Sequence, residues 1–218
     1  MRDEQIHAAV RIVKKTIRQW EEPVVGVVAR ESHDPFRILI ACLLSLRTKD
    51  HTTAEASQRL FTLADTPALM LTLPLKQVER AIYPVGFYKT KAKQILSICQ
   101  SLLDDFDGQV PDSLDDLLTL KGVGRKTANL VVTVGFNKPG ICVDIHVHRI
   151  SNRWGYIQTK TPEESEQALR KKLPQKYWIN FNDWLVPYGQ NLCRPVSPFC
   201  SQCLVSKYCQ RVGVSTSR

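Results

Sequence analysis

Two glycines set two residues apart, Gly122 and Gly124, constrain the fold of this chain more than any other feature. An apolar helical turn precedes them, and a second helical run extends from Lys126 to Gly135. Because glycine leaves the backbone without side-chain cover, the N–H groups at the start of the second helix can meet an anion closely. The pattern predicts a tight helix-hairpin-helix at about residues 114–133, and the natural anion for it is a phosphate.

Lys126 falls in the first turn of the second predicted helix, where the positive end of the helix dipole disfavours an ammonium ion. The dipole supplies at most about 2 kcal/mol of the roughly 4 kcal/mol that a neutral amine nucleophile requires at pH 7. Desolvation and the neighbouring cation Arg125 would have to supply the remainder. The alternative role for Lys126 is a solvated lysine, or one that touches phosphate.

Asp144 follows a turn and precedes a helical run from Ile145 to Trp154, so its simplest role is a helix N-cap. Two consecutive helices joined by a short turn can also bring such a carboxylate back towards Lys126. An amine and a carboxylate are the minimum pair for displacing a base from a deoxyribose. The amine attacks the anomeric carbon, and the carboxylate stabilises an oxocarbenium-like sugar or accepts the amine proton. Lys126 and Asp144 are therefore the candidate catalytic pair.

The segment from Leu120 to Asn129, followed by Val143-Asp144-Ile145-His146, resembles the signature of the helix-hairpin-helix DNA glycosylases, and specifically of the endonuclease III family. In that family the position of Lys126 holds the Schiff-base lysine, and the position of Asp144 holds the catalytic aspartate. The resemblance pairs two motifs at the right distance and extends over nearly the whole chain. It implies DNA contacts by the hairpin residues Gly122, Val123, Gly124 and Arg125.

The resemblance assigns DNA contacts to three further residues. Arg47 occupies the position of a residue, usually a glutamine in the family, that fills the gap left by the flipped base. A guanidinium can still stack on the base that has lost its partner and donate hydrogen bonds to it. Phe87 occupies the position of a wedge opposite the lesion, usually a leucine, and an aromatic ring can wedge by stacking. A surface arginine and a core phenylalanine are the alternative roles. The third residue, Arg194, is the one cation in a loop that is normally rich in basic residues.

Four of the seven cysteines lie in one short segment with the spacing C-x6-C-x2-C-x5-C: Cys193, Cys200, Cys203 and Cys209. Four thiols so close together in a reducing compartment favour a metal centre over disulfides. Zinc also accepts four thiolates, but a structural zinc site usually shows two close pairs, and here only Cys200 and Cys203 make one. The unequal loops fit a [4Fe-4S] cluster, and the spacing matches the cluster segment of the endonuclease III family at every interval.

The chain has 218 residues, 43% of them apolar, and a net charge of +9. It can bury a substantial core, and its charge indicates a polyanionic partner, nucleic acid before membrane. No apolar signal core stands at the beginning, and the longest apolar run, Ile38–Leu44, is far shorter than the ~18 residues of a membrane span. We therefore expect an intracellular protein of the cytoplasm and nucleoid. We expect it to be a monomer that binds double-stranded DNA containing damaged bases or abasic sites.

Helical periodicity recurs along the chain and no segment alternates with period two between hairpin turns, which predicts an all-α fold. Capping residues mark helix starts at Asp34, Thr66, Ser113 and Thr161. Among the predicted helices are those over Asp3–Trp20, Phe36–Leu46, Lys91–Phe106 and Tyr177–Asn191. We expect two helical domains with a DNA-binding cleft between them: a helical barrel of residues 23–133, and a cluster domain of residues 1–22 plus 134–218.

The resemblance implies a base-excision-repair enzyme that flips a damaged pyrimidine out of the duplex and breaks its glycosidic bond. The same enzyme would then nick the strand by β-elimination through an imine on Lys126. Two rival functions remain. One is a monofunctional mismatch or uracil glycosylase of the same fold, in which Lys126 touches phosphate. The other is a non-catalytic, cluster-bearing protein that binds DNA.

Overall fold

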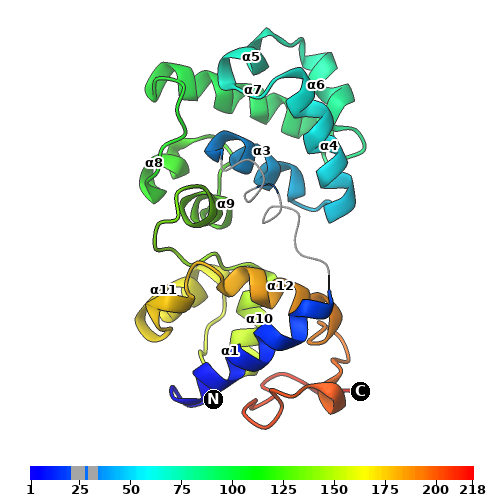
Figure 1. The fold of residues 1–218 in the computed structure, drawn as a ribbon, viewed down its shortest axis with the longest axis vertical. Coiled ribbons are helices and arrows are strands. Elements are labelled where there is room, and N and C mark those ends of the chain that lie inside the picture. The colour runs from blue at the N-terminus through cyan, green and yellow to red at the C-terminus, as the bar shows by residue number, and fades with distance from the viewer. Residues whose placement is uncertain (21–27, 29–33) are drawn as a thin grey trace. The chain divides into compact units, whose positions relative to one another are not determined.

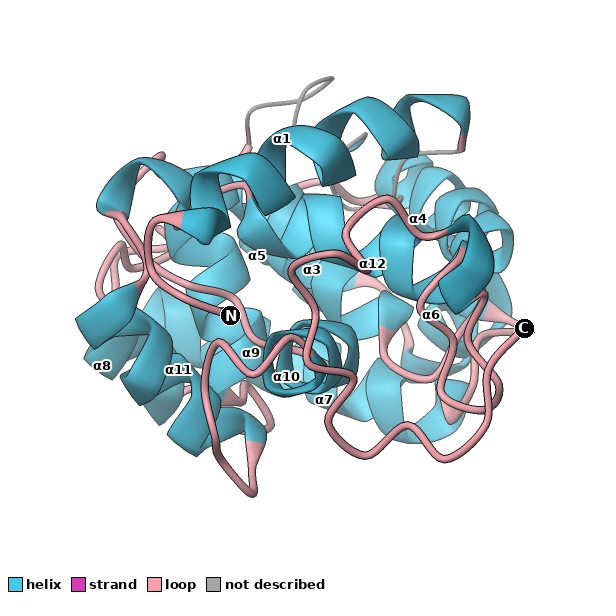
Figure 2. Ribbon diagram, turned by 90° about the horizontal axis from the view of Figure 1, so that it is seen from below, coloured by secondary structure: helices cyan, strands magenta, loops and turns pink. Residues whose placement is uncertain are grey.

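The computed structural model describes residues 1–20, 28 and 34–218. These residues form helices, turns and loops with no strand among them, which confirms the predicted all-α fold (Figure 2). The chain divides into two compact units: Val24–Lys138, here called the hairpin unit, and Met1–Pro23 with Pro139–Arg218, here called the cysteine unit. The domain boundary predicted at residues 22 and 23 lies outside the described residues. None of the helices in the described ranges is long and apolar enough to cross a membrane.

The hairpin unit is built around one buried helix. Eight of the eleven residues of α3 (Pro35–Ser45) are buried, among them Ile38, Leu39 and Ile40, each with no exposed surface. The other elements of this unit follow α3 along the chain (Figure 1): α4 (Asp50–Leu63), α5 (Pro67–Thr72), α6 (Leu75–Ile82), α7 (Tyr88–Asp105), α8 (Leu114–Thr119), α9 (Arg125–Leu130) and the π-helix η2 (Val131–Gly135). Helices α4, α7 and α9 and the π-helix η2 pack against α3 and bury its apolar side chains.

The cysteine unit joins a helix from the beginning of the chain to segments from its last third. Its elements are α1 (Gln5–Thr16), the 3-10 turn η1 (Ile17–Gln19), α10 (Ile145–Arg153), α11 (Pro162–Lys172), η3 (Gln175–Tyr177), α12 (Phe181–Asn191) and η4 (Cys200–Gln202). Helix α10 packs against α11 and α12, and α1 packs against α12. Large aromatic side chains fill the core between these helices, including Trp154, Tyr156, Phe181 and Tyr188.

Side-chain caps confirm the predicted helix starts. Asp34 accepts a hydrogen bond from the Phe36 N–H at 2.8 Å before α3, and Thr66 accepts one from the Leu69 N–H before α5. Ser113 caps α8 and Thr161 caps α11 in the same way. Each cap satisfies an N–H group that the helix itself leaves without a partner, which is why the short polar residues marked these positions in the sequence.

Three predicted helix bounds were wrong. Helix α7 begins at Tyr88 rather than Lys91, because the chain leaves its preceding loop at Phe87, which has a left-handed backbone conformation. The helix predicted over Tyr177–Asn191 is interrupted, and α12 begins only at Phe181, after Asn180 at its N-cap. The helix predicted over Asp3–Trp20 becomes α1 followed by the tighter turn η1.

Candidate active site and cysteine centre

The predicted helix-hairpin-helix is present in the hairpin unit. Helix α8 ends at Thr119 and α9 begins at Arg125, and between them the Val123 N–H donates to the Leu120 carbonyl at 3.0 Å. Gly122 has a φ of 84°, and a Cβ at this position would collide with the side chain of Gln94. The backbone conformation therefore favours glycine here, while the flexible Gln94 side chain would have to move to admit a Cβ.

Gly124 serves the hairpin in a different way. It is the N-cap of α9 with an ordinary φ of −91°, and a Cβ built on it would lie in open space. A glycine N-cap has no side-chain oxygen, so no side chain of residue 124 covers the positive end of α9. The side chain of Val123 is buried, which leaves only its backbone to meet a ligand.

Lys126 is the second residue of α9 and is partly buried. The four residues that follow it, from Thr127 to Leu130, are all buried, and α9 packs against both α8 and α3. The backbone of Lys126 is thus fixed by the core, while its long side chain starts at the edge of the hairpin. This placement suits a residue that must present an amine at a defined point.

Asp144 is the N-cap of α10 in the cysteine unit. Its Oδ1 accepts hydrogen bonds from the N–H groups of His146 at 2.8 Å and Val147 at 2.9 Å, so the simple role considered from the sequence is present. Its Oδ2 accepts no hydrogen bond from a described residue. The cap fixes the carboxylate by one oxygen and leaves the other for a ligand. Because Lys126 belongs to the hairpin unit, the pairing of the two side chains stays a prediction.

Arg47 and Phe87 contact each other on the hairpin unit. Both have positive φ values, 54° for Arg47 and 60° for Phe87, which bulky residues rarely adopt. The Arg47 guanidinium lies 5.6 Å from the centre of the Phe87 ring. Phe87 is 62% exposed, so its alternative role as a core residue is wrong. The exposed stack has the size and flatness of a group that can insert between bases.

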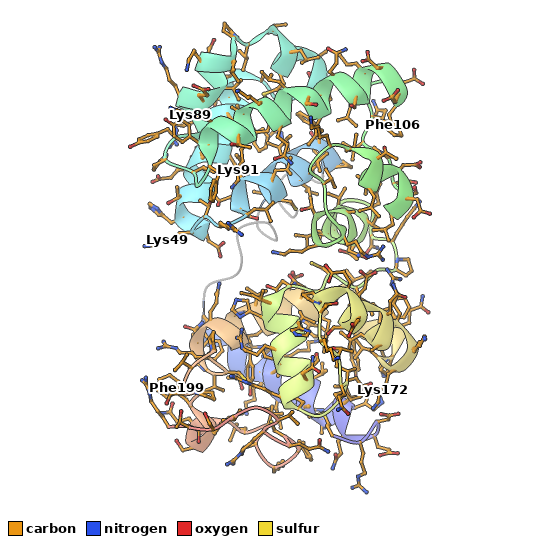
Figure 3. The ribbon with its side chains drawn as sticks, turned by 180° about the vertical axis from the view of Figure 1, so that it is seen from behind. Lys49, Lys89, Lys91, Phe106, Lys172 and Phe199 are labelled. Carbon is orange, nitrogen blue, oxygen red and sulfur yellow. The ribbon has the colours of Figure 1, made fainter. Side chains whose placement is uncertain are left out.

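Lys91 is a residue of this site that the sequence analysis missed. Its side chain lies on α7 (Figure 3) and is 6% exposed. It donates hydrogen bonds to the carbonyls of Leu44 at 2.9 Å and Leu46 at 2.6 Å. Burial lowers the pKa of Lys91 to about 8. In the sequence Lys91 stands between Lys89 and Lys93 and looks like part of a solvated basic face.

The four cysteines of the spaced pattern line one small cavity in the cysteine unit. Tyr188 and Arg153 line the same cavity, and the Tyr188 hydroxyl lies 2.9 Å from Cys203 Sγ. No three Cys, His, Asp or Glu side chains in the described parts of the chain are placed to hold a single metal ion. The four thiols are nevertheless gathered around this one cavity in the cysteine unit.

Burial sets the protonation of the side chains that line this cavity. Burial raises the pKa of the Cys193 thiol, while a hydrogen bond and charge from Arg153 lower it in part. Burial likewise raises the pKa of the Cys209 thiol. Burial and the nearby Cys203 raise the pKa of Tyr188, so its hydroxyl stays protonated beside the sulfur. Neutral thiols lose their protons when a metal binds to the sulfur atoms.

Two arginines of α10, which the sequence analysis did not single out, tie this helix to the cysteine segment. Arg149 Nη2 donates to the carbonyls of Gly189 at 3.1 Å and Cys193 at 2.9 Å. Arg153, 8% exposed, donates to the Arg194 carbonyl and, at 2.6 Å, to that of Pro195. Their spacing of four residues was the available signal, since it places both on one helix face. Asp144, at the N-cap of the same helix, is thereby held in one block with Cys193.

Arg194 is exposed, and its guanidinium lies 5.1 Å from the centre of the Phe199 ring. It projects from the loop between the first two cysteines, where the resemblance placed a phosphate contact. The side chain is therefore available to an anion, while its backbone carbonyl is held by Arg153.

The glycine hairpin, the lysine that follows it and the all-helical fold define a class. The family described as "HhH-GPD superfamily base excision DNA repair protein" matches residues 40–175. Endonuclease III of Thermotoga maritima is 46% identical over 177 residues, which cover 81% of this chain and 83% of the relative. Endonuclease III of Escherichia coli K12 is 37% identical over 176 residues, with the same shares covered.

The solved structures agree with the sequence comparison. The structure titled "Structure of a Trapped Endonuclease III-DNA Covalent Intermediate: Estranged-Adenine Complex" matches with a TM-score of 0.85 and 33% identity, covering 97% of both chains. The chain therefore belongs to the endonuclease III family of the HhH-GPD superfamily, as the motif resemblance implied. Enzymes of this family are DNA glycosylases and AP lyases of base excision repair.

Proposed function

We propose that this chain is a bifunctional DNA N-glycosylase and AP lyase that removes oxidised or otherwise damaged pyrimidines from duplex DNA. One observation carries the proposal: a lysine stands in the first turn of the second hairpin helix, in a chain 46% identical to an endonuclease III. A structural neighbour is titled as a covalent intermediate of such an enzyme with DNA. A lysine amine is the group that such an intermediate requires.

In the proposed reaction the Lys126 amine attacks the anomeric carbon of the flipped nucleotide. The bond from this carbon to the base breaks, and the base leaves with the bonding electrons and takes up a proton. The nitrogen of Lys126 loses its protons, and the sugar ring opens to give an imine. Loss of a proton from the adjacent carbon then expels the 3′ phosphate by β-elimination, and water releases the lysine. Asp144 stabilises the oxocarbenium-like sugar or accepts the amine proton through the oxygen that does not cap α10.

The remaining predicted residues bind the DNA and help to extrude the damaged base. We assign phosphate contacts to the backbone of Gly122, Val123 and Gly124 and to the Arg125 side chain, with a further contact from Arg194. Arg47 fills the gap left by the flipped base, and Phe87 wedges beside it. Extruding a base costs a few kcal/mol, and phosphate contacts must offset this, so binding should weaken steeply with salt. The double-stranded DNA partner carries damaged bases or abasic sites. The enzyme acts as a monomer in the cytoplasm and nucleoid.

We assign a [4Fe-4S] cluster to Cys193, Cys200, Cys203 and Cys209. The shared cavity, the hydroxyl of Tyr188 beside Cys203 and the guanidinium of Arg153 beside Cys193 support this assignment. When bound, the cluster supplies thiolate-ligated iron that crosslinks the segment, and the ligand set leaves no protein position open for substrate. Its role here is architectural: it holds residues 193–209 against α10 and α12.

Borohydride trapping on duplex DNA with a thymine glycol or an abasic site tests the imine. The intact protein should form a stable covalent adduct, Lys126→Ala should form none, and Lys121→Ala should keep it. Lys121 is a matched control because it is an exposed lysine in the same hairpin. An unchanged adduct in Lys126→Ala overturns the mechanism.

The rivals give other results in the same assay. Base release without any adduct in the intact protein supports a monofunctional glycosylase. Failure to release any base from duplexes carrying thymine glycol, uracil or a mispaired thymine supports a non-catalytic DNA-binding protein.

A further inference from the structure

The buried ammonium group of Lys91 contacts three oxygens of one continuous segment, residues 44–48. Besides the carbonyls of Leu44 and Leu46, its Nζ lies 3.3 Å from the Thr48 hydroxyl oxygen. These oxygens belong to the last turn of α3 and the loop that follows it, and Arg47 lies between two of them. A surface lysine that touches DNA would need exposure, whereas Lys91 is 6% exposed. Its role is therefore exerted inside the hairpin unit.

The same loop contacts the turn that precedes α7. The Gly86 N–H donates to the Thr48 hydroxyl at 3.2 Å, and a Cβ on Gly86 would lie 2.7 Å from the Arg47 carbonyl oxygen. Thr48 thus receives one hydrogen bond from each side, from Lys91 and from Gly86. Glycine at position 86 is required by this close approach and not by a positive φ, because that conformation belongs to Phe87.

Arg47 and Phe87 both hold a left-handed backbone conformation beside these contacts. Bulky residues keep such a conformation only when the surrounding structure fixes it, and such sites occur where a side chain must be presented in a defined direction. Here the fixed direction brings the guanidinium over the ring at 5.6 Å. The buried lysine and the threonine are the polar groups that join the two turns.

We propose that Lys91 is a positioning residue for base flipping. Its buried side chain locks the loop of Arg47 to the turn of Phe87, so that the two exposed side chains enter the duplex as one preformed stack. The inference rests on the proposed function and assigns to it a residue that touches neither DNA nor the reacting atoms. A preformed stack loses less conformational freedom on insertion than two independently mobile side chains, so it favours the flipped state.

Single-turnover base release from two duplexes tests this role. In the first duplex the lesion faces a normal base. In the second it faces an abasic analogue, so there is no partner to separate and no widowed base to contact. Lys91→Met should lose about 10- to 100-fold in rate on the first duplex, and about threefold or less on the second, because extrusion is easier when the base is unpaired. Lys93→Met, two residues along α7 and exposed, is the matched control and should change neither rate appreciably.

A second variant keeps the test decisive if Lys91→Met folds poorly. Thr48→Val preserves shape but removes the hydroxyl shared by Lys91 and Gly86, and it should show a smaller loss of the same kind, confined to the paired lesion. Equal losses on the two duplexes in both variants overturn the positioning role while leaving the proposed function intact. Absence of base release by the intact protein on both duplexes contradicts the proposed function itself.

Discussion

The hairpin unit and the last segment of the cysteine unit, from Cys193 to Arg218, are stabilised differently. In the hairpin unit, α3 buries eight of its eleven residues, and the hairpin is shaped by backbone geometry at Gly122. In the cysteine unit, the segment from Cys193 to Arg218 contains only two buried residues, Pro198 and Val205. Apolar burial therefore holds the first unit together, while the last segment of the second depends on polar contacts and on whatever the cysteines bind.

The two catalytic candidates are therefore held in position by different interactions. Lys126 stands on a helix fixed by an apolar core, so its position should not depend on the metal centre. Asp144 stands on α10, which Arg149 ties to the carbonyl of Cys193. Disruption of the cysteine segment should therefore alter the position of Asp144 more than that of Lys126.

Loss of one cysteine ligand should give the largest effect. Cys203→Ser should yield a colourless protein with residues 193–218 open to protease, because structural metal sites contribute on the order of 10 kcal/mol to folding. Amide exchange in α3 and α7 should stay slow. Cys99→Ala is the control: Cys99 is buried in α7, burial raises its pKa to about 12, and its loss should leave the colour unchanged. An equal increase in amide exchange rate in the two units of Cys203→Ser would contradict this difference in stabilisation.

Asp144→Asn separates the capping role from the catalytic role. Asparagine caps a helix as well as aspartate does, so the melting temperature should change by no more than about 2 °C, while base release falls roughly 10²- to 10⁴-fold. Thermal unfolding and single-turnover base release provide the two readouts. Retained base release would remove the carboxylate from the mechanism and leave it as a cap alone.

Stability at alkaline pH reports on the buried lysine. Because burial lowers the pKa of Lys91 to about 8, the folded protein loses this proton at a lower pH than the unfolded chain, where the ordinary value of about 10.4 applies. The free energy of unfolding should therefore rise with pH between about 8 and 10, relative to Lys91→Met. Urea unfolding at pH 7 and pH 9.5 should show the difference between the two proteins growing by about 2 kcal/mol. No change in that difference would show that Lys91 keeps its proton.

Substitution of the two hairpin glycines should affect different properties: stability at Gly122 and DNA binding at Gly124. Gly122→Ala should lower the free energy of unfolding by about 1–2 kcal/mol, because it forces an alanine into a positive φ and displaces Gln94. Gly124→Ala should change stability by a few tenths of a kcal/mol but weaken DNA binding, since its methyl group lies over the start of α9. Urea unfolding and DNA titration at one salt concentration check both. Equal losses of stability in the two variants would contradict the claim that only Gly122 is required by the backbone conformation.

Much of the fold was predictable because local chemistry marks it. The caps at Asp34, Thr66, Ser113 and Thr161 and the hairpin residue Gly122 each satisfy a requirement of the backbone within a few residues. The family resemblance followed from the hairpin and the segment around Asp144.

The contacts that position the site were not predictable, because they join residues far apart in the sequence. Lys91 is buried only because α3 ends beneath α7 and presents two carbonyls to it. Arg149 and Arg153 are held by carbonyls about forty residues away. The stack of Arg47 on Phe87 needs two turns that meet in space. A charged side chain in the sequence does not show whether such acceptors exist, so the burial of Lys91 and Arg153 appears only in the structure.

The central claim is that the amine of Lys126 forms the covalent bond to DNA. The most direct measurement is mass spectrometry of peptides from the borohydride-reduced complex with an abasic duplex. The claim predicts one sugar adduct, on the peptide that carries Lys126 and at that side chain. An adduct on another lysine, such as Lys121, would contradict it.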